Sequence, residues 1–228
     1  MRHFFFLATL AIATAAGTGC SDGVNGDVTA TQNGASTVNG SVHVPAGLHS
    51  GGVSTVNGSV HIDDSATVGG ASTVNGGIDM GAHASADSLS TVNGAVTLQD
   101  GAHVAHAVTT VNGGINLQSG AEVAGSVRNV NGRIALAGAH VAGGLRTVGG
   151  DIDVSGGSHV EGGILVDKDT SLFNWNRSVP RIVIGPGAVV QGDLRFEREV
   201  KLYVSDKATV GPVSGATAVR FSGDSPPG

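Results

Sequence analysis

Histidine is the residue of this chain best suited to bind a metal ion or to change charge near neutral pH. The tetrapeptide Gly101–Val104 reads Gly-Ala-His-Val, and its near copies predict one column of side chains on successive repeats: His49, His83, His103, Glu122, His140 and His159. Imidazoles on adjacent repeats would lie about 5 Å apart, close enough to share a divalent metal ion. They would also repel one another when protonated, below about pH 6.5.

A purely structural origin of this column is the alternative. Outward positions of a duplicated repeat accept any polar residue, and Thr67 and Glu122 fall in the same column as the histidines. A second, shorter column holds His43, His61 and Asp79. We therefore predict no resident metal or other cofactor, and four histidines remain the candidate metal ligands: His83, His103, His140 and His159.

Cys20 is the only cysteine and follows an apolar stretch, Phe4–Ala16, that is too short to span a bilayer. The segment resembles a bacterial lipoprotein signal, in which the cysteine becomes the lipidated N-terminus, although Gly17 stands where such signals usually carry leucine. Cleavage after Ala15 is the alternative, and it would leave an unpaired thiol in an oxidising compartment. We predict lipidation of Cys20. The resemblance to such lipoproteins also implies the outer membrane, because Ser21 and not Asp stands next to the cysteine.

Two aromatic residues and an arginine stand in a segment that interrupts the apolar pattern. Phe173, Trp175 and Arg177 lie within Asp167–Arg181, which contains the only tryptophan. Exposed aromatic and arginine side chains dominate binding hot spots, so these three are the candidate partner contact. The alternative is that Trp175 folds back and shields an exposed edge of the fold.

A five-residue block, Ser-Thr-Val-Asn-Gly, must position all of these groups. It occurs as Ser36–Gly40, Ser54–Gly58, Ser72–Gly76 and Ser90–Gly94, and degenerate copies follow as Thr109–Gly113, Arg128–Gly132 and Arg146–Gly150. The valines of these copies are 18 or 19 residues apart. A fixed period of this length is typical of a solenoid, in which each repeat buries its apolar face against its neighbours.

The period divides into thirds, because apolar or small residues also recur every six positions: Val56, Ile62, Val68, Val74, Met80, Ala86, Val92, Leu98 and Val104. With 38 glycines in 228 residues, helices are disfavoured and short strands are favoured. We predict an all-β, three-sided β-helix solenoid of about 18 residues per coil.

We expect each residue type of the block to have its own structural role. The valine should face the core, and Asn-Gly should turn the chain through a positive φ. The threonines and asparagines should stack into ladders from coil to coil. One-residue insertions after Val104 and Val123 should fall at corners.

The chain divides into six predicted segments. They are a lipoprotein-type signal peptide (1–19), a tether with a short imperfect first turn (20–35), regular coils (36–164), a projecting loop (165–181), final coils (182–213) and a C-terminal tail (214–228).

Charge excludes several classes of function. The formal net charge is −6, and no Lys or Arg occurs between Arg2 and Arg128, against eight acidic residues. The chain therefore lacks the basic surface that nucleic-acid binding needs. The first coils also lack the Lys and Arg that polysaccharide lyases use in catalysis. We predict no enzyme activity. The alternative is an acyltransferase-like enzyme, because Ile184–Val190 resembles the hexapeptide repeat of left-handed β-helix acyltransferases.

Between Ser36 and Val213, the [Val/Ile]-x-Gly-x-aliphatic coils and the ending Ile182–Phe196 resemble the bactofilins, which are polymer-forming bacterial cytoskeletal proteins. They also resemble β-helix lipoproteins of the DUF4097 adhesin-like group. The resemblance to bactofilins implies a right-handed helix. Bactofilins are cytosolic, so the export signal departs from that family.

Taken together, these features predict an exported, lipid-anchored rod about 45 Å long. We expect a structural, scaffold or adhesive role in the cell envelope, with the membrane as partner through the lipid anchor. Open ends of a β-helix expose unpaired strand edges, so copies should associate end to end.

Overall fold

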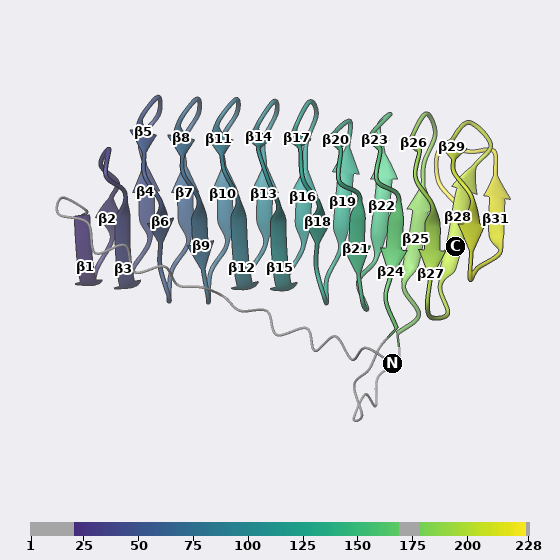
Figure 1. Cartoon of the computed structure of the whole chain (residues 1–228), viewed down its shortest axis with the longest axis horizontal. Coiled ribbons are helices and arrows are strands. Elements are labelled where there is room, and N and C mark those ends of the chain that lie inside the picture. The colour runs from purple at the N-terminus through teal and green to yellow at the C-terminus, as the bar shows by residue number, and fades with distance from the viewer. Residues whose placement is uncertain (1–20, 169–177, 227–228) are drawn as a thin grey trace.

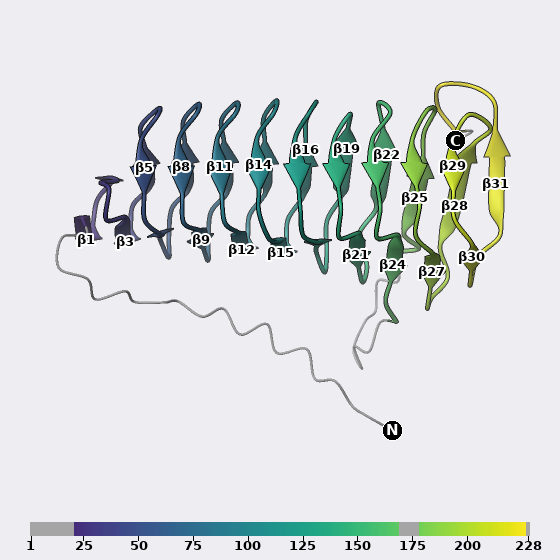
Figure 2. The same cartoon turned by 45° about the horizontal axis from the view of Figure 1, so that its top comes forward.

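The computed structural model describes residues 21–168 and 178–226, and within these ranges the chain contains strands but no helix. Three parallel sheets of 11, 11 and 9 strands stack as a three-sided solenoid of about ten turns (Figure 1). The coils follow one another along a single axis (Figure 2). The predicted three-sided β-helix of about 18 residues per coil is confirmed.

Each coil contributes one short strand to each sheet, except that the first and last coils contribute none to the third. The first sheet contains β1 (Ser21–Asn25), β3 (Ala35–Asn39), β6 (Val53–Ser54), β9 (Ala71–Thr73), β12 (Leu89–Asn93), β15 (Val108–Asn112), β18 (Val127–Arg128), β21 (Leu145–Thr147), β24 (Ile164–Val166), β27 (Leu194–Phe196) and β30 (Val213–Ser214). The second contains β2 (Val28–Thr29), β4 (Val42–Val44), β7 (Val60–Ile62), β10 (Ile78–Met80), β13 (Val96–Leu98), β16 (Ile115–Leu117), β19 (Ile134–Ala137), β22 (Ile152–Ser155), β25 (Arg181–Ile184), β28 (Lys201–Ser205) and β31 (Ala218–Phe221). The third contains β5 (His49–Ser50), β8 (Thr67–Val68), β11 (Ser85–Ala86), β14 (His103–Val104), β17 (Glu122–Val123), β20 (His140–Val141), β23 (His159–Val160), β26 (Val189–Val190) and β29 (Thr209–Val210).

One apolar core runs the length of the stack, from Ala30 to Val204. It is built from in-register columns, of which Val42, Val60, Ile78 and Val96 are one example. All four of these side chains are fully buried. Because each coil buries its apolar side chains against the coils on either side, the core grows by addition and needs no closed globular shape.

The prediction that the valine of each block faces the core is wrong. In β3 burial alternates, so that Ala35 and Thr37 point inward while Val38 is 41% exposed. The same inward position is filled by a buried threonine in most other coils: Thr55, Thr73, Thr91, Thr110 and Thr147. Inward and outward side chains alternate every two residues along a strand, and this alternation restarts after each corner. The six-residue period spans the corners and therefore assigned the valines to the wrong face.

Both predicted ladders exist. The exposed asparagines donate from Nδ2 to Oδ1 of the asparagine in the preceding coil, over distances of 2.7–3.1 Å, along Asn25, Asn39, Asn57, Asn75, Asn93, Asn112 and Asn131. Five buried threonines form their ladder differently, because each hydroxyl donates to a glycine carbonyl of the preceding coil: Thr37, Thr55, Thr73, Thr91 and Thr110. Thr55, for example, donates to the Gly40 oxygen over 2.7 Å. The Thr147 hydroxyl instead accepts from the Gly150 amide.

The block glycines are required for a different reason than predicted. Gly58, Gly76 and Gly94 do not have a positive φ. A Cβ at any of them would instead lie 1.9 Å from the glycine carbonyl oxygen of the preceding coil. Close stacking of backbone on backbone excludes a side chain at this corner, and only Gly132 among the described block glycines also has a positive φ, 126°.

Positive φ is needed at another corner, between the second and third sheets. There a tight turn closes with a hydrogen bond such as that from the Ala102 amide to the Gln99 carbonyl, 3.1 Å. The residue before the buried alanine has a positive φ, as at Gly101 (68°). Type II turns have this requirement at their third residue. Ser65 and His83 hold the same position with φ of 58° and 55°.

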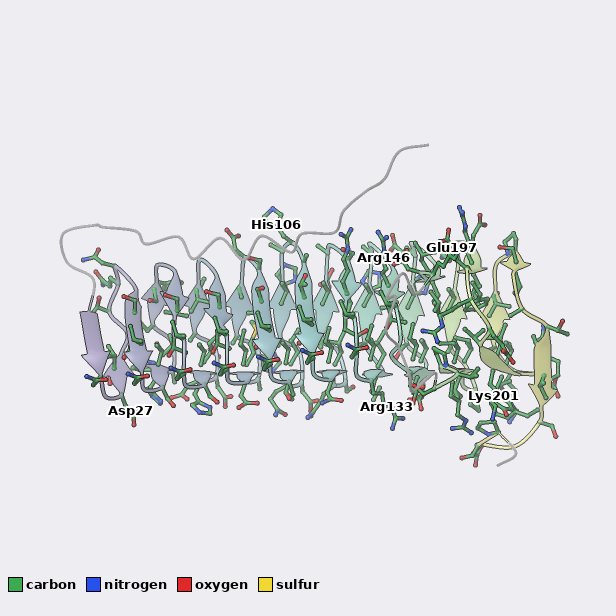
Figure 3. All side chains as sticks on the ribbon, turned by 90° about the horizontal axis from the view of Figure 1, so that it is seen from below. Asp27, His106, Arg133, Arg146, Glu197 and Lys201 are labelled. Carbon is green, nitrogen blue, oxygen red and sulfur yellow. The ribbon has the colours of Figure 1, made fainter. Side chains whose placement is uncertain are left out.

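The predicted insertions do fall at corners. Two residues separate β11 from β12, whereas three separate β14 from β15, and three also separate β17 from β18. His106 lies at the first of these wider corners, between the third and first sheets, on the side of the rod opposite Arg133 (Figure 3).

The ends of the fold differ from the predicted segments. Ser21–Asn25, assigned to a tether with an imperfect first turn, forms β1 and pairs in register with β3. Ala218–Phe221, assigned to a tail, forms β31 and pairs with β28. The predicted loop is shorter at both ends, because β24 extends to Val166 and β25 begins at Arg181. The chain thus forms coils closer to both of its ends than the repeat pattern indicated.

Candidate functional site

The outward face of the third sheet brings the predicted histidine column together. Strand pairing places nine residues in register, namely His49, Thr67, Ser85, His103, Glu122, His140, His159, Val189 and Thr209. Each adjacent pair belongs to neighbouring coils, so the side chains follow one another at the strand spacing of about 4.8 Å. Four residues in succession, His103 to His159, are titratable.

His83 does not belong to this column, and its assignment there is wrong. Register places Ser85 beside His103, whereas His83 stacks on Gly101. The Gly-Ala-His motif is displaced by two residues in this coil, because Ala84, and not Ala82, is the buried alanine of the turn. The motif repeats in the sequence, but in this coil it is out of step with the 18-residue period, which pairs Ser85 with His103.

Two carboxylates contact the histidines of this column: Glu122 within it and Glu161 beside it. Glu122 lies between two imidazoles, with Oε2 3.4 Å from His103 Nδ1 and Oε1 3.7 Å from His140 Nδ1. On its other side, His140 Nε2 lies 2.9 Å from Oε1 of Glu161. The His140 and His159 rings stand edge to face with centroids 5.5 Å apart. These side chains are about 40–50% exposed, which leaves them open to ions in solution.

Sequence reasoning missed Glu161 because it does not lie in the column. It is the first residue after β23, at the corner towards the first sheet. The signal that identifies it is its position two residues after His159, which returns its side chain to the outward face. His140, His159 and Glu161 each offer one ligand atom, and these atoms all lie within 4.8 Å of one another.

The second histidine column, on the second sheet, is confirmed in register as His43, His61 and Asp79. Its close contacts are pairwise: His43 Nε2 lies 3.1 Å from Asp63, and His61 Nδ1 lies 3.4 Å from Asp79. A depression of about 360 Å³ beside them is lined by both polar and apolar groups, including Gln99, Met80 and Asp64. Within the described residues these groups do not bring three ligand atoms together.

A groove on the first sheet, of about 300 Å³, gathers the outward arginines Arg128, Arg146 and Arg195. Arg146 donates from Nε and Nη2 to the two carboxylate oxygens of Asp167. This hydrogen bonding raises the pKa of Arg146 above its ordinary value, although partial burial opposes the shift. Arg195 pairs with Glu197 over 2.7 Å, and Arg146 and Glu197 lie on the same side of the rod (Figure 3). Two of the three guanidinium groups are therefore neutralised in place.

The other predicted site residues lie outside the described ranges. They are Cys20, the candidate lipidation site, and Phe173, Trp175 and Arg177, the candidate partner contact. Asp167, where the loop leaves β24, and Pro180, where it reaches β25, are both described. In the described part of the chain there is no helix with the length and hydropathy to cross a membrane.

Comparison with known proteins gives no identity. No family model, no curated protein and no solved structure matches this chain.

Proposed function

We propose that this protein is an exported, lipid-anchored rod with a structural, scaffold or adhesive role in the cell envelope. The observation that carries the proposal is the continuous stack of three parallel sheets around a single apolar core. With 11 strands in the longest sheets, the stack is about 50 Å long at the strand spacing. A body of this kind resists bending, because bending would break strand pairing and core packing together.

The position of the first strand supports anchoring at one end. β1 begins at Ser21, the residue directly after Cys20. A lipid on Cys20 would therefore hold the first coil close to the membrane with no intervening linker. A single acyl chain gives only marginal membrane binding, whereas several chains on one cysteine anchor stably.

The anchor is tested by fractionation of cells that express the full chain. The wild type should remain in the membrane fraction through a high-salt wash and enter the detergent phase, whereas Cys20→Ala should not be labelled by radioactive palmitate. Palmitate labelling of Cys20→Ala equal to that of the wild type would refute lipidation at this residue.

We also propose that copies associate end to end, and the unpaired strand edges support this. In β2, the amides of Val28 and Ala30 donate to the next coil, 2.9 and 2.7 Å. Because backbone groups alternate in direction along a parallel strand, the amide of Thr29 between them points away from the stack. Such an edge can pair with a strand of a second copy.

The C-terminal edge is more protected. Arg220 occupies the position that Val204 and Ile184 fill with aliphatic side chains in the two preceding coils. Its guanidinium donates to the Ser205 carbonyl over 3.3 Å, and the residue is exposed. A charge at an inward position is one device by which proteins limit edge pairing. Association should therefore be weak and limited by Arg220.

Sedimentation velocity and negative-stain microscopy of the purified protein in detergent test the association. Wild type should form oligomers at high concentration, Thr29→Pro should be monomeric, and Arg220→Leu should associate more strongly. Thr29→Ser, which keeps the amide, is the matched control and should behave as wild type. A wild type that stays monomeric at every concentration, together with a monomeric Arg220→Leu, would refute end-to-end assembly and leave the anchored rod standing.

A further inference from the structure

We propose that His140, His159 and Glu161 bind one zinc ion, with Glu122 as the group that orients His140. Two imidazole nitrogens and one carboxylate oxygen form a donor set typical of Zn²⁺ sites that keep an open fourth position. The ligand atoms of the three residues lie within 4.8 Å of one another. Small side-chain rotations suffice to bring them to the spacing of a tetrahedral site.

The backbone beneath the site is fixed. The amides of His140, His159 and Glu161 donate to carbonyls of the preceding coil over 2.9, 2.9 and 3.0 Å. Val141 and Val160, which alternate with the ligands along β20 and β23, are fully buried in the core. Only side-chain torsions are therefore free to change when the ion binds, which keeps the ordering cost low.

The two ring nitrogens of His140 face different carboxylates. Nε2 lies 2.9 Å from Glu161 and so faces the proposed ion, whereas Nδ1 faces Glu122 Oε1 at 3.7 Å. A carboxylate that accepts from the second nitrogen of a metal-bound histidine fixes its tautomer and raises its basicity. Glu122 is placed to do this without becoming a ligand.

Local charge favours a cation here. The column of the third sheet contains no Lys or Arg at any of its nine positions, and Glu122 and Glu161 bring two carboxylates to the site. Nitrogen donors select zinc over calcium or magnesium, which prefer oxygen ligands throughout. In the described part of the chain, no other three such groups bring their ligand atoms this close to one another.

The proposal is tested by calorimetric titration with zinc. The full untagged chain, in detergent, is first freed of bound metals. The parent and all variants carry Cys20→Ser, so that no unlipidated Cys20 thiolate can bind zinc. We expect one zinc per chain with micromolar affinity and no binding of calcium. His159→Ala and His140→Ala should weaken binding at least tenfold, and Glu122→Gln about tenfold.

His49→Ala and His103→Ala are the matched controls, since both remove a histidine of the same column outside the proposed ligand set. Both should bind zinc as the parent does. Thermal unfolding gives a second readout: zinc should raise the melting temperature of the parent and leave that of His159→Ala unchanged. Absence of binding at 100 μM zinc, or several weak sites that persist in His159→Ala, would overturn the proposal.

Discussion

The Thr91 hydroxyl donates a 2.8 Å hydrogen bond to the carbonyl oxygen of Gly76 in the preceding coil. That same oxygen lies only 1.9 Å from the position that a Cβ of Gly94 would occupy. One carbonyl therefore explains two residues of the repeated block: the buried threonine satisfies it, and the following glycine leaves room for it. The block is a packing unit in which both residues serve the same backbone group.

Replacement of Gly94 should destabilise the fold strongly. A Cβ at this position clashes with backbone that cannot move without breaking the strand ladder, so Gly94→Ala should cost about 3 kcal/mol. Gly52→Ala is the control, because Gly52 has no positive φ and the nearest atom to its Cβ position is 3.9 Å away. It should stabilise by about 0.5 kcal/mol through the unfolded chain. Thermal unfolding followed by circular dichroism measures both, and similar melting temperatures for the two variants would contradict this explanation.

Removal of the Thr91 hydroxyl should also destabilise the protein, although the side-chain volume is kept. Thr91→Val leaves the Gly76 carbonyl without its side-chain donor in a buried corner, at a cost of about 1–2 kcal/mol. Thr97→Val makes the same chemical change at an outward position of β13 and should be nearly neutral. Chemical denaturation gives the difference; an equal effect of the two changes would show that the buried hydrogen bond does not contribute.

Glycine at position 83 should stabilise the protein. His83 has a φ of 55° at a turn position where Gly101 and Gly120 stand in the following coils. The left-handed conformation costs a residue with a Cβ about 1 kcal/mol, so His83→Gly should raise the melting temperature. Ala82→Gly, at the neighbouring position without a positive φ, should lower it. Since His83 lies outside the proposed zinc site, His83→Gly should also bind zinc as wild type does.

The Arg146–Asp167 pair should contribute stability that does not vary between neutral and moderately alkaline pH. The pairing raises the pKa of Arg146 in the folded protein. The stabilisation from the pair is therefore fully present at any pH below the pKa of arginine in the unfolded chain. It is lost only as pH rises through the raised value. Asp167→Asn should therefore cost about 1–2 kcal/mol at both pH 7 and pH 9.

Asp153→Asn is the control for the pair, because Asp153 pairs with Arg133, whose side chain is 60% exposed. It should change stability by less than about 0.5 kcal/mol. A difference between wild type and Asp167→Asn that shrinks from pH 7 to pH 9 would contradict the assignment of the effect to Arg146.

The sequence by itself determined the architecture. A period of 18 residues, divided into thirds and rich in glycine, permits few structures other than a three-sided stack of short parallel strands, because each repeat can bury its apolar residues only against its neighbours. The asparagine ladder followed from the same period. Identical residues at a fixed period must lie above one another once the coils stack.

Only the tertiary structure shows whether an individual side chain points into the core or out to solvent. Val38 and Thr37 are adjacent, and the side of the strand that each occupies depends on where the alternation of two restarts after a corner. The period of six cannot supply that information. His83 is a different case, because a strict count of 18 residues already pairs it with Gly101, and the positive φ at both positions agrees with that count.

The candidate zinc site shows the same division. The sequence supplied His140 and His159 through their spacing, whereas Glu161 joined them only because the chain turns a corner directly after β23 and returns a carboxylate to the same face. Repetition along a chain thus determines which residues share a column. Which residues of different columns meet depends on corner geometry, and that is set by backbone packing between coils.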